Sequence, residues 1–128
     1  MPGKLLIVDD EADVREFAAN FFRKRKIEVA IASSGEEALA MLKNKLPSLV
    51  LLDIKMAGID GVEALSRIRQ QYGKLKVIMV SGKDPEEDSA MKRCIELGAD
   101  GYIHKPLQLD ELERRVLAVL NKEVAVGN

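Results

Sequence analysis

Short apolar runs alternate with longer amphipathic segments along the chain. Five of these runs have the length of a strand: LLIV (5–8), EVAIA (28–32), LVLL (49–52), KVIMV (76–80) and GYIH (101–104). Most are rich in branched aliphatic residues and contain few polar interruptions, which is typical of strands that are covered on both faces. The pattern therefore predicts buried, parallel strands at these five places.

The segments between the runs carry apolar residues at helical spacing. Four such stripes are Val14, Phe17, Ala18 and Phe21; Leu39, Leu42 and Leu46; Val62, Leu65 and Ile68; and Leu109, Leu112, Val116 and Leu120. Residues three and four apart share one face of a helix, so each stripe predicts a helix that buries one side. Ser34 with Glu37, and Asp84 followed by Pro85, mark two helix starts, and the last helix is expected to begin near Gln108.

Strands alternating with helices predict an α/β fold with a doubly wound, five-stranded parallel sheet. In such sheets, polar residues that follow the strands gather at one edge, where ligands bind. Asp9 and Asp10 follow the first predicted strand, Asp53 the third, Ser81 the fourth and Lys105 the fifth. These five side chains are therefore expected to converge.

The composition of the chain excludes several classes of function. The chain has 128 residues, 47% of them hydrophobic, which suits one domain with a sizeable core. With 20 basic and 21 acidic residues it lacks the positive charge that direct nucleic-acid binding requires. No apolar run fits a signal peptide or a membrane span, so a cytoplasmic protein without membrane contact is expected. The single cysteine, Cys94, excludes an internal disulfide and is expected in the core.

The predicted cluster of acids favours a hard divalent cation. At about 5 Å and an effective dielectric near 20, two ionised carboxylates repel by roughly 3 kcal/mol, so three of them need a cation or raised pKa values. Carboxylate and carbonyl oxygens are the ligands that Mg²⁺ prefers. Zinc is not favoured, because the sequence has no pair of His or Cys ligands. With Lys105 and Ser81 beside the acids, the edge is suited to receive a phosphoryl group on a carboxylate nucleophile.

This combination of residues resembles the receiver domains of two-component response regulators, in a layout similar to the stand-alone regulators of chemotaxis. The resemblance covers residues 4–121 and rests on Asp9-Asp10, Asp53, Ser81, Tyr102 and Lys105-Pro106 at their strand ends. It implies a flavodoxin-like fold with strand order 2-1-3-4-5. Residues 1–122 would form the receiver domain, and residues 123–128 a tail or the start of a linker.

The resemblance implies a role for each site residue. Asp53 would accept a phosphoryl group from a histidine kinase or a histidine phosphotransfer protein. Asp10, Asp53 and the backbone carbonyl of Lys55 would bind Mg²⁺ directly, and Asp9 would bind it through water. Lys105 would pair with the phosphoryl oxygens, and the Lys105-Pro106 peptide bond would be cis, an isomer that proline makes accessible.

The family also implies a conformational switch. The Ser81 hydroxyl would turn toward the phosphoryl group and Tyr102 would move into the space it leaves, although a strand tyrosine is ordinarily a packed aromatic. The fourth helix, fifth strand and fifth helix would then bind a downstream protein target or an output domain, or form a phosphorylation-dependent dimer. The side chains of Lys55 and Lys83 are candidates to tune the lifetime of the phosphorylated state.

Several alternative functions fit these residues less well. A haloacid-dehalogenase-type phosphohydrolase needs a second acid where Lys55 stands, and a flavodoxin-like cofactor binder needs a phosphate loop where DDEAD stands. Capping of the first helix would explain only one of Asp9 and Asp10. His104 has no second ligand and is expected to have no phosphotransfer or metal role. A phosphorylation-silent interaction module or a phosphate sink of the same fold stays open; a separate enzyme activity is not expected.

Overall fold

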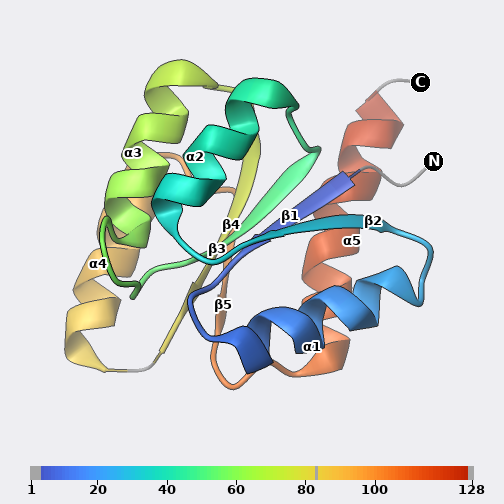
Figure 1. Cartoon of the computed structure of the whole chain (residues 1–128), viewed down its shortest axis with the longest axis horizontal. Coiled ribbons are helices and arrows are strands. Elements are labelled where there is room, and N and C mark those ends of the chain that lie inside the picture. Colours follow the sequence, from blue (N-terminus) through green and yellow to red (C-terminus); the bar gives the residue numbers. More distant parts are fainter. Residues whose placement is uncertain (1–3, 83, 127–128) are drawn as a thin grey trace.

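A computed structural model describes residues 4–82 and 84–126 as strands and helices in strict alternation (Figure 1). The strands are β1 (Lys4–Val8), β2 (Glu28–Ala32), β3 (Leu49–Asp53), β4 (Lys76–Ser81) and β5 (Gly101–His104). The helices are α1 (Ala12–Arg23), α2 (Gly35–Asn44), α3 (Gly61–Gln71), α4 (Pro85–Glu96) and α5 (Leu109–Val126). All five predicted strands are present, and their bounds differ from the prediction by one residue at most.

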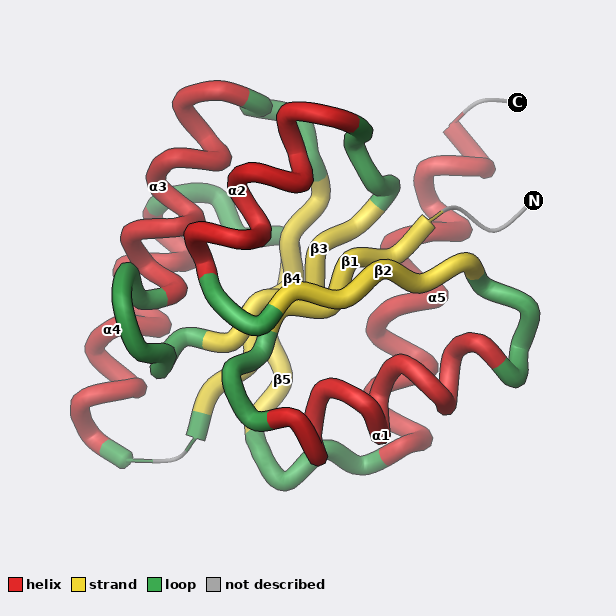
Figure 2. Tube along the Cα trace, in the orientation of Figure 1, coloured by secondary structure: helices red, strands yellow, loops and turns green. Residues whose placement is uncertain are grey.

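The strands form one parallel sheet at the centre of the molecule (Figure 2). Their order is β2-β1-β3-β4-β5, which confirms the predicted doubly wound topology. Because the chain moves outward from β1 in both directions, β1 and β3 are neighbours and their carboxyl ends lie side by side. The functional residues that follow these two strands are thereby brought together.

Helices cover both faces of the sheet, with α1 and α5 on one side and α2, α3 and α4 on the other (Figure 1). Side chains alternate along each strand: Leu5 and Ile7 pack with the first pair of helices, and Leu6 and Val8 with the other three. Both sets are buried, which explains why the strand sequences are continuously apolar. Cys94, in α4, is fully buried as expected.

The predicted helical stripes are partly wrong in register. Helix α1 buries Ala18, Ala19 and Phe22, whereas Phe17, predicted to face the core, is 50% exposed. The face of α1 that packs against the sheet is the one that carries the two small alanines. The prediction was wrong because it placed the larger Phe17 on that face. Leu46 and Leu109 are also exposed, since the first follows the end of α2 and the second is the first residue of α5.

The predicted helix starts are confirmed by their capping contacts. The Ser34 hydroxyl accepts a hydrogen bond from the Glu37 amide at 3.0 Å, and the Asp84 carboxylate accepts one from the Glu87 amide at 2.9 Å. The Glu37 carboxylate departs from the reciprocal capping box, because it accepts from the amide of Ser33 at 2.6 Å. Each cap satisfies an amide that the helix itself leaves without a partner.

Helix α5 begins at Leu109, one residue after the predicted start, and extends to Val126. The first four residues of the predicted tail, 123–126, therefore continue this helix. The domain boundary at residue 122 stays a prediction.

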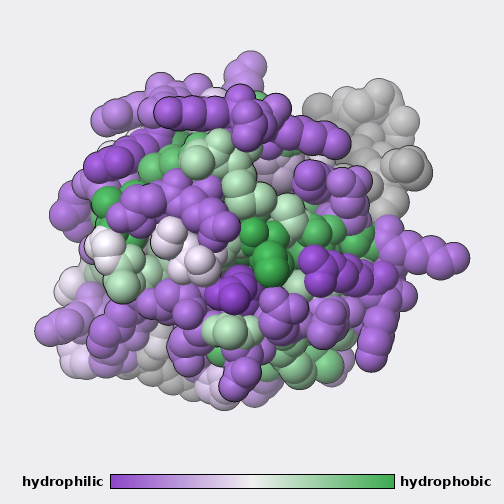
Figure 3. Space-filling model, viewed as in Figure 1, coloured by the Kyte–Doolittle hydropathy of each residue, from purple (hydrophilic) through white to green (hydrophobic). Residues whose placement is uncertain are grey.

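Strand β2 is an edge of the sheet and is only partly covered. Its residues Val29, Ala30 and Ile31 are half-buried. In Figure 3 apolar atoms gather over the middle of the face where β2 runs, within a surface that is otherwise mostly hydrophilic. The charged pair Lys4–Glu28, 3.6 Å apart, lies at the start of this edge, where charge discourages pairing with another strand.

We expect Gly61→Ala to destabilise the domain by about 1–3 kcal/mol, because helix α3 begins against the end of β3. A methyl group at this position would lie 2.3 Å from the Asp53 carbonyl oxygen and 2.6 Å from the Ile54 Cα, and both of these are backbone atoms. Gly73→Ala is the matched control, since its methyl group would lie 3.6 Å from the nearest atom. Urea unfolding would measure both, and equal losses in the two variants would contradict the expectation.

Candidate functional site

Three carboxylates meet at the carboxyl edge of the sheet. Asp9 follows β1, Asp53 ends β3, and Val8 pairs with Leu52 across the two strands, so the two acids lie opposite one another. Asp10 follows Asp9 and its carboxylate accepts a hydrogen bond from the Ala57 amide at 3.2 Å. One oxygen from each of the three carboxylates lies within 4.8 Å of the others, so the predicted convergence is observed.

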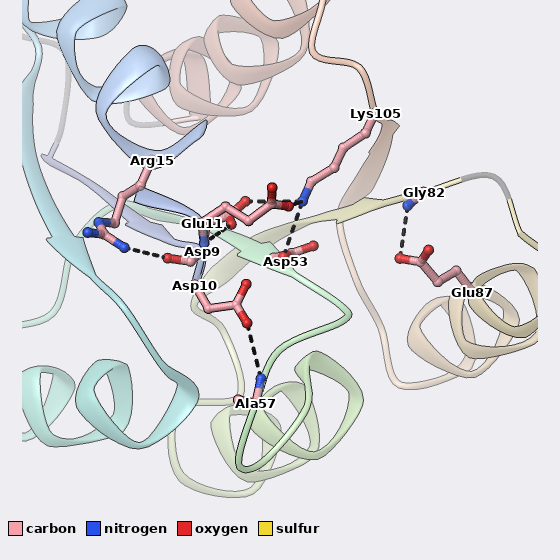
Figure 4. Close-up of polar contacts among 9 residues, drawn as sticks. All are labelled: Asp9, Asp10, Glu11, Arg15, Asp53, Ala57, Gly82, Glu87 and Lys105. Atoms are coloured by element: carbon pink, nitrogen blue, oxygen red, sulfur yellow. Dashed lines mark hydrogen bonds and ion pairs between the residues drawn. The ribbon is translucent and has the colours of Figure 1, made fainter. Parts of the chain in front are cut away.

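Lys105 reaches this cluster from the end of β5 (Figure 4). Its ammonium nitrogen lies 3.3 Å from Asp53 Oδ2, 3.4 Å from Asp9 Oδ2 and 3.2 Å from Glu11 Oε1. Asp53 and Asp9 are almost fully buried, whereas Glu11 is exposed. One cation thus bridges two buried acids and an exposed one, and Glu11 is a member of the site that the sequence analysis did not single out.

The backbone around Asp9 is held by its own neighbours. Its carboxylate accepts a hydrogen bond from the Glu11 amide at 2.8 Å, and the Arg15 guanidinium donates to its carbonyl oxygen at 2.9 Å (Figure 4). Glu11 is the capping residue of α1, and its side chain makes no capping bond. Asp9 therefore supports the turn into α1 with one carboxylate oxygen and faces Lys105 with the other.

Burial and mutual repulsion shape the protonation of the cluster. Burial, reinforced by the charge of Asp9, raises the pKa of Asp53 to about 7, although Lys105 acts in the opposite direction. Burial likewise raises the pKa of Asp9 above its ordinary value. For Lys105 burial lowers the pKa, but attraction to Asp53 and Asp9 outweighs burial and raises it. Without a further cation, the cluster holds more negative charge than its one ammonium balances.

The donor set fits a hard divalent cation. Asp53 Oδ1 is buried and has no hydrogen-bond partner among the described residues, whereas its other oxygen faces Lys105. Buried carboxylate oxygens ordinarily have partners, so this atom has capacity for a ligand. Together with the exposed carboxylate of Asp10 it offers the oxygen ligands that Mg²⁺ prefers.

Lys55 lies in the loop between β3 and α3, two residues after Asp53, and its side chain is exposed. The hydrogen bond from the Glu87 amide, helped by the charge of Lys55, lowers the pKa of Asp84 at the start of α4. The proposed ligand role of the Lys55 carbonyl stays a prediction. Lys83, the other predicted tuning residue, lies outside the described residues.

Ser81 ends β4 and is fully buried, and it pairs across the strands with His104 of β5. The Ser81 hydroxyl lies 3.1 Å from His104 Nδ1, so the histidine contacts the predicted switch residue. Tyr102 is 39% exposed and its ring meets the imidazole edge to face, with ring centroids 5.7 Å apart. The Lys105-Pro106 peptide bond is cis, as the resemblance implied.

The fold and the acidic edge define a class: flavodoxin-like α/β domains whose strand ends carry a cluster of carboxylates beside a lysine. The model of the response regulator receiver domain matches residues 5–117, and the chain belongs to this family of two-component signalling domains. This confirms the family that the residues resembled. No helix in the described part of the chain combines the length and the hydropathy needed to cross a bilayer.

Individual relatives agree with the family assignment. The chain is 35% identical over 122 residues to the alkaline phosphatase synthesis transcriptional regulatory protein PhoP of Bacillus subtilis, covering 95% of this chain and 50% of that protein. It thus spans about half the length of this relative. Its fold is similar to a CheY-like receiver domain from Methanospirillum hungatei JF-1, with a TM-score of 0.89 and 29% identity over 98% of both chains. It is also similar to the receiver domain of NtrX from Brucella abortus, with a TM-score of 0.84 and 34% identity over 91% of this chain and 98% of that one.

The raised pKa of Asp53 predicts how stability depends on pH when divalent cations are chelated. The folded chain holds this proton up to about pH 7, and the unfolded carboxyl loses it near 3.8, so the proton stabilises the fold at low pH and the gain is lost as pH rises through 7. We expect the free energy of unfolding to fall by on the order of 2 kcal/mol from about pH 5 to about pH 8.

Asp53→Asn should remove most of this dependence and unfold at higher urea concentration than the parent chain at the upper pH. Glu16→Gln, which also removes one negative charge but from the exposed face of α1, is the control. Urea titrations with EDTA at both pH values would measure the slopes. Parallel slopes for the parent chain and Asp53→Asn would be evidence against a raised pKa at Asp53.

Proposed function

We propose that this receiver domain takes up a phosphoryl group on Asp53 in a Mg²⁺-dependent reaction and thereby switches the surface formed by α4, β5 and α5. The observation that carries the proposal is the state of the Asp53 carboxylate. It lies at a strand end, one oxygen faces Lys105 at 3.3 Å, and the other is buried without a partner among the described residues. Lys105 thereby holds one oxygen in place, and the other has no hydrogen bond that an incoming ligand would have to displace.

The proposed transfer requires no further nucleophile or base. An Asp53 carboxylate oxygen attacks the phosphorus of a phosphohistidine, the O–P bond forms, and the P–N bond to the donor imidazole breaks. The attacking group must be ionised, which a pKa near 7 permits for part of the population at neutral pH. Asp10, Asp53 and the Lys55 carbonyl, with Asp9 through water, would hold Mg²⁺, and the ion would supply positive charge against the phosphoryl oxygens.

Lys105 would follow the negative charge as it moves. In the resting site its ammonium bridges Asp53 and Asp9. Once Asp53 carries the phosphoryl group, the attacking carboxylate oxygen is bonded to phosphorus in an acyl phosphate, and the charge lies on the phosphoryl oxygens, a short distance farther out. The flexible lysine stem lets the ammonium pair with those oxygens instead, a charge-assisted contact that would hold the group in place.

A histidine kinase or a histidine phosphotransfer protein is the proposed donor. A mostly apolar groove adjoins the site through Lys105, and its other lining residues are Asp13, Val14 and Phe17 of α1 and Pro106 and Leu107 after β5. Phe17, half exposed, offers an apolar anchor of the kind that protein interfaces bury. A donor protein seated there would bring its phosphohistidine to Asp53.

The proposed output is a change of binding at the surface of α4, β5 and α5. The Ser81 hydroxyl would turn to the phosphoryl group and Tyr102 would respond, so that a downstream protein or an output domain binds or is released, or two copies associate. A hydrogen bond to a charged acceptor is worth about 1.5–3 kcal/mol, enough to shift a two-state balance about tenfold or more. Phosphoryl transfer to Asp53 and hydrolysis from it are the only chemistry proposed.

We expect the intact mass to increase by about 80 Da, one phosphoryl group, when the chain is incubated with acetyl phosphate and Mg²⁺. The adduct should be absent from Asp53→Asn, which keeps the shape of the carboxylate without its nucleophilic charge, and from samples with excess EDTA. Glu16→Gln, with the same loss of charge on exposed α1, should gain the full mass. An unmodified parent chain that also fails to bind beryllofluoride would favour a phosphorylation-silent interaction module.

Side chains next to the phosphoryl group should set how long it survives. Because Lys55 is exposed in the loop behind Asp53, its ammonium could screen the phosphoryl charge or obstruct the hydrolytic water. We expect Lys55→Ala to change the dephosphorylation half-life at least twofold, and Lys83→Ala to do the same. Mass spectra taken after removal of phosphodonor would give the half-lives, with Lys92→Ala, on the exposed face of α4, as control. Unchanged half-lives in both variants would remove the tuning role.

A further inference from the structure

The only histidine of the chain lies against the switch hydroxyl. In the register of the sheet Ser81 and His104 are direct partners on β4 and β5, and their side chains meet at 3.1 Å. Ser81 is fully buried, so this contact is made away from bulk water. The sequence analysis gave His104 no role, because it considered metal binding and phosphotransfer and not a contact with Ser81.

The direction of this contact depends on the imidazole tautomer, and the surroundings of Ser81 favour its hydroxyl as the donor. A serine hydroxyl has one proton to donate, and buried donors need an acceptor. Asp53 Oδ1 has no hydrogen-bond partner among the described residues, so the Ser81 hydroxyl does not donate to it. His104 Nδ1 is the acceptor that lies within reach. If the Ser81 hydroxyl donates to Nδ1, the imidazole carries its own proton on Nε2 and accepts the serine proton on Nδ1.

From this geometry we infer that His104 is a positioning residue for the Ser81 hydroxyl: in the resting domain its Nδ1 holds the hydroxyl proton away from Asp53, and a phosphoryl group must take that proton from it. The inference rests on the proposed function. It adds that His104 Nδ1 competes with the phosphoryl group for the hydrogen bond of the Ser81 hydroxyl. Phosphoryl oxygens are charged acceptors and form stronger hydrogen bonds than a neutral imidazole nitrogen does. The exchange is therefore favoured once Asp53 is modified, and opposed before.

The same imidazole connects the hydroxyl with the outer surface. Its ring meets Tyr102 edge to face, with an interplanar angle of 71°, and the Arg115 guanidinium of α5 lies 5.9 Å from the centre of the Tyr102 ring. Tyr102 and His104 are two residues apart on β5 and so share one side of the strand. When the Ser81 hydroxyl leaves Nδ1, the His104 ring, against which Tyr102 packs, is no longer held by that hydrogen bond. His104 thus lies between the two residues of the proposed switch.

Nuclear magnetic resonance of the single imidazole tests the inference directly, since its ring signals need no assignment among several histidines. In alkaline solution, where an ordinary imidazole is neutral, the ¹⁵N shifts should report the Nε2–H tautomer with a hydrogen-bonded Nδ1. Ser81→Ala should move the Nδ1 signal toward the value of a free nitrogen. Beryllofluoride with Mg²⁺ should move it in the same direction in the parent chain and leave it unmoved in Asp53→Asn.

The outcomes separate the inference from the proposed function. If beryllofluoride binds, as its ¹⁹F signal would report, and the His104 signals do not move, the inference is wrong while the function stands. An Nδ1–H tautomer in the parent chain would also overturn it. Failure of beryllofluoride to bind at all would remove the proposed function, and the inference with it.

A matched pair of substitutions tests the competition. Asn at position 104 can place an acceptor near the position of Nδ1, whereas Val cannot. We expect His104→Val to bind beryllofluoride about two- to tenfold more tightly than the parent chain, the factor that one neutral hydrogen bond contributes. His104→Asn should stay within about twofold of the parent, and in a Ser81→Ala background the two variants should bind alike.

Thermal unfolding of each variant would verify that the beryllofluoride affinities are compared between folded proteins. Equal affinities of His104→Val, His104→Asn and the parent chain would mean that the contact only joins the ends of β4 and β5, and would overturn the inference.

Discussion

The structure depends on the repulsion of carboxylates that the sheet brings together and on Lys105, which opposes it. At an effective dielectric near 20, the Coulomb attraction between Lys105 and Asp53 is about 5 kcal/mol before the cost of burying the two charges, and two carboxylates 4.8 Å apart repel by about 3.5 kcal/mol. Asp9, Asp10 and Asp53 form three pairs that lie no farther apart than this, so the Lys105 ammonium reduces the repulsion without removing it. The edge is left acidic enough to prefer a second, mobile cation, and this is the chemical basis of the proposed transfer.

The rest of the fold makes that arrangement rigid. Asp53 cannot move away from Asp9, because β3 is buried on both faces and paired with β1 and β4. Behind it, the Gly61 amide donates to the Ile54 carbonyl at 2.7 Å, so α3 begins directly against the end of the strand. The site is therefore costly to the stability of the protein, and the packing of the strands and of α3 offsets that cost.

Much of this arrangement could be predicted from the sequence, because it follows from chain topology. The convergence of Asp9, Asp53 and Lys105 needs only the alternation of elements and the rule that parallel strands end at one edge. The strand order β2-β1-β3-β4-β5, by contrast, was implied by the family resemblance. Contacts made by side chains alone were harder to predict. The ion pair of Glu11 with Lys105 joins residues 94 positions apart, and the contact of His104 with Ser81 depends on register between β4 and β5.

The sheet separates two apolar clusters, one under α1 and α5 and one under α2, α3 and α4. Adjacent strand residues belong to different clusters: Leu51 packs with the first and Leu52 with the second. A change of side-chain volume on one face is therefore accommodated among the helices of that face. The surface around α1 and the packing beneath α3 and α4 can therefore change independently of one another, while Asp9, Asp53 and Lys105 stay at the ends of the strands that lie between the two clusters.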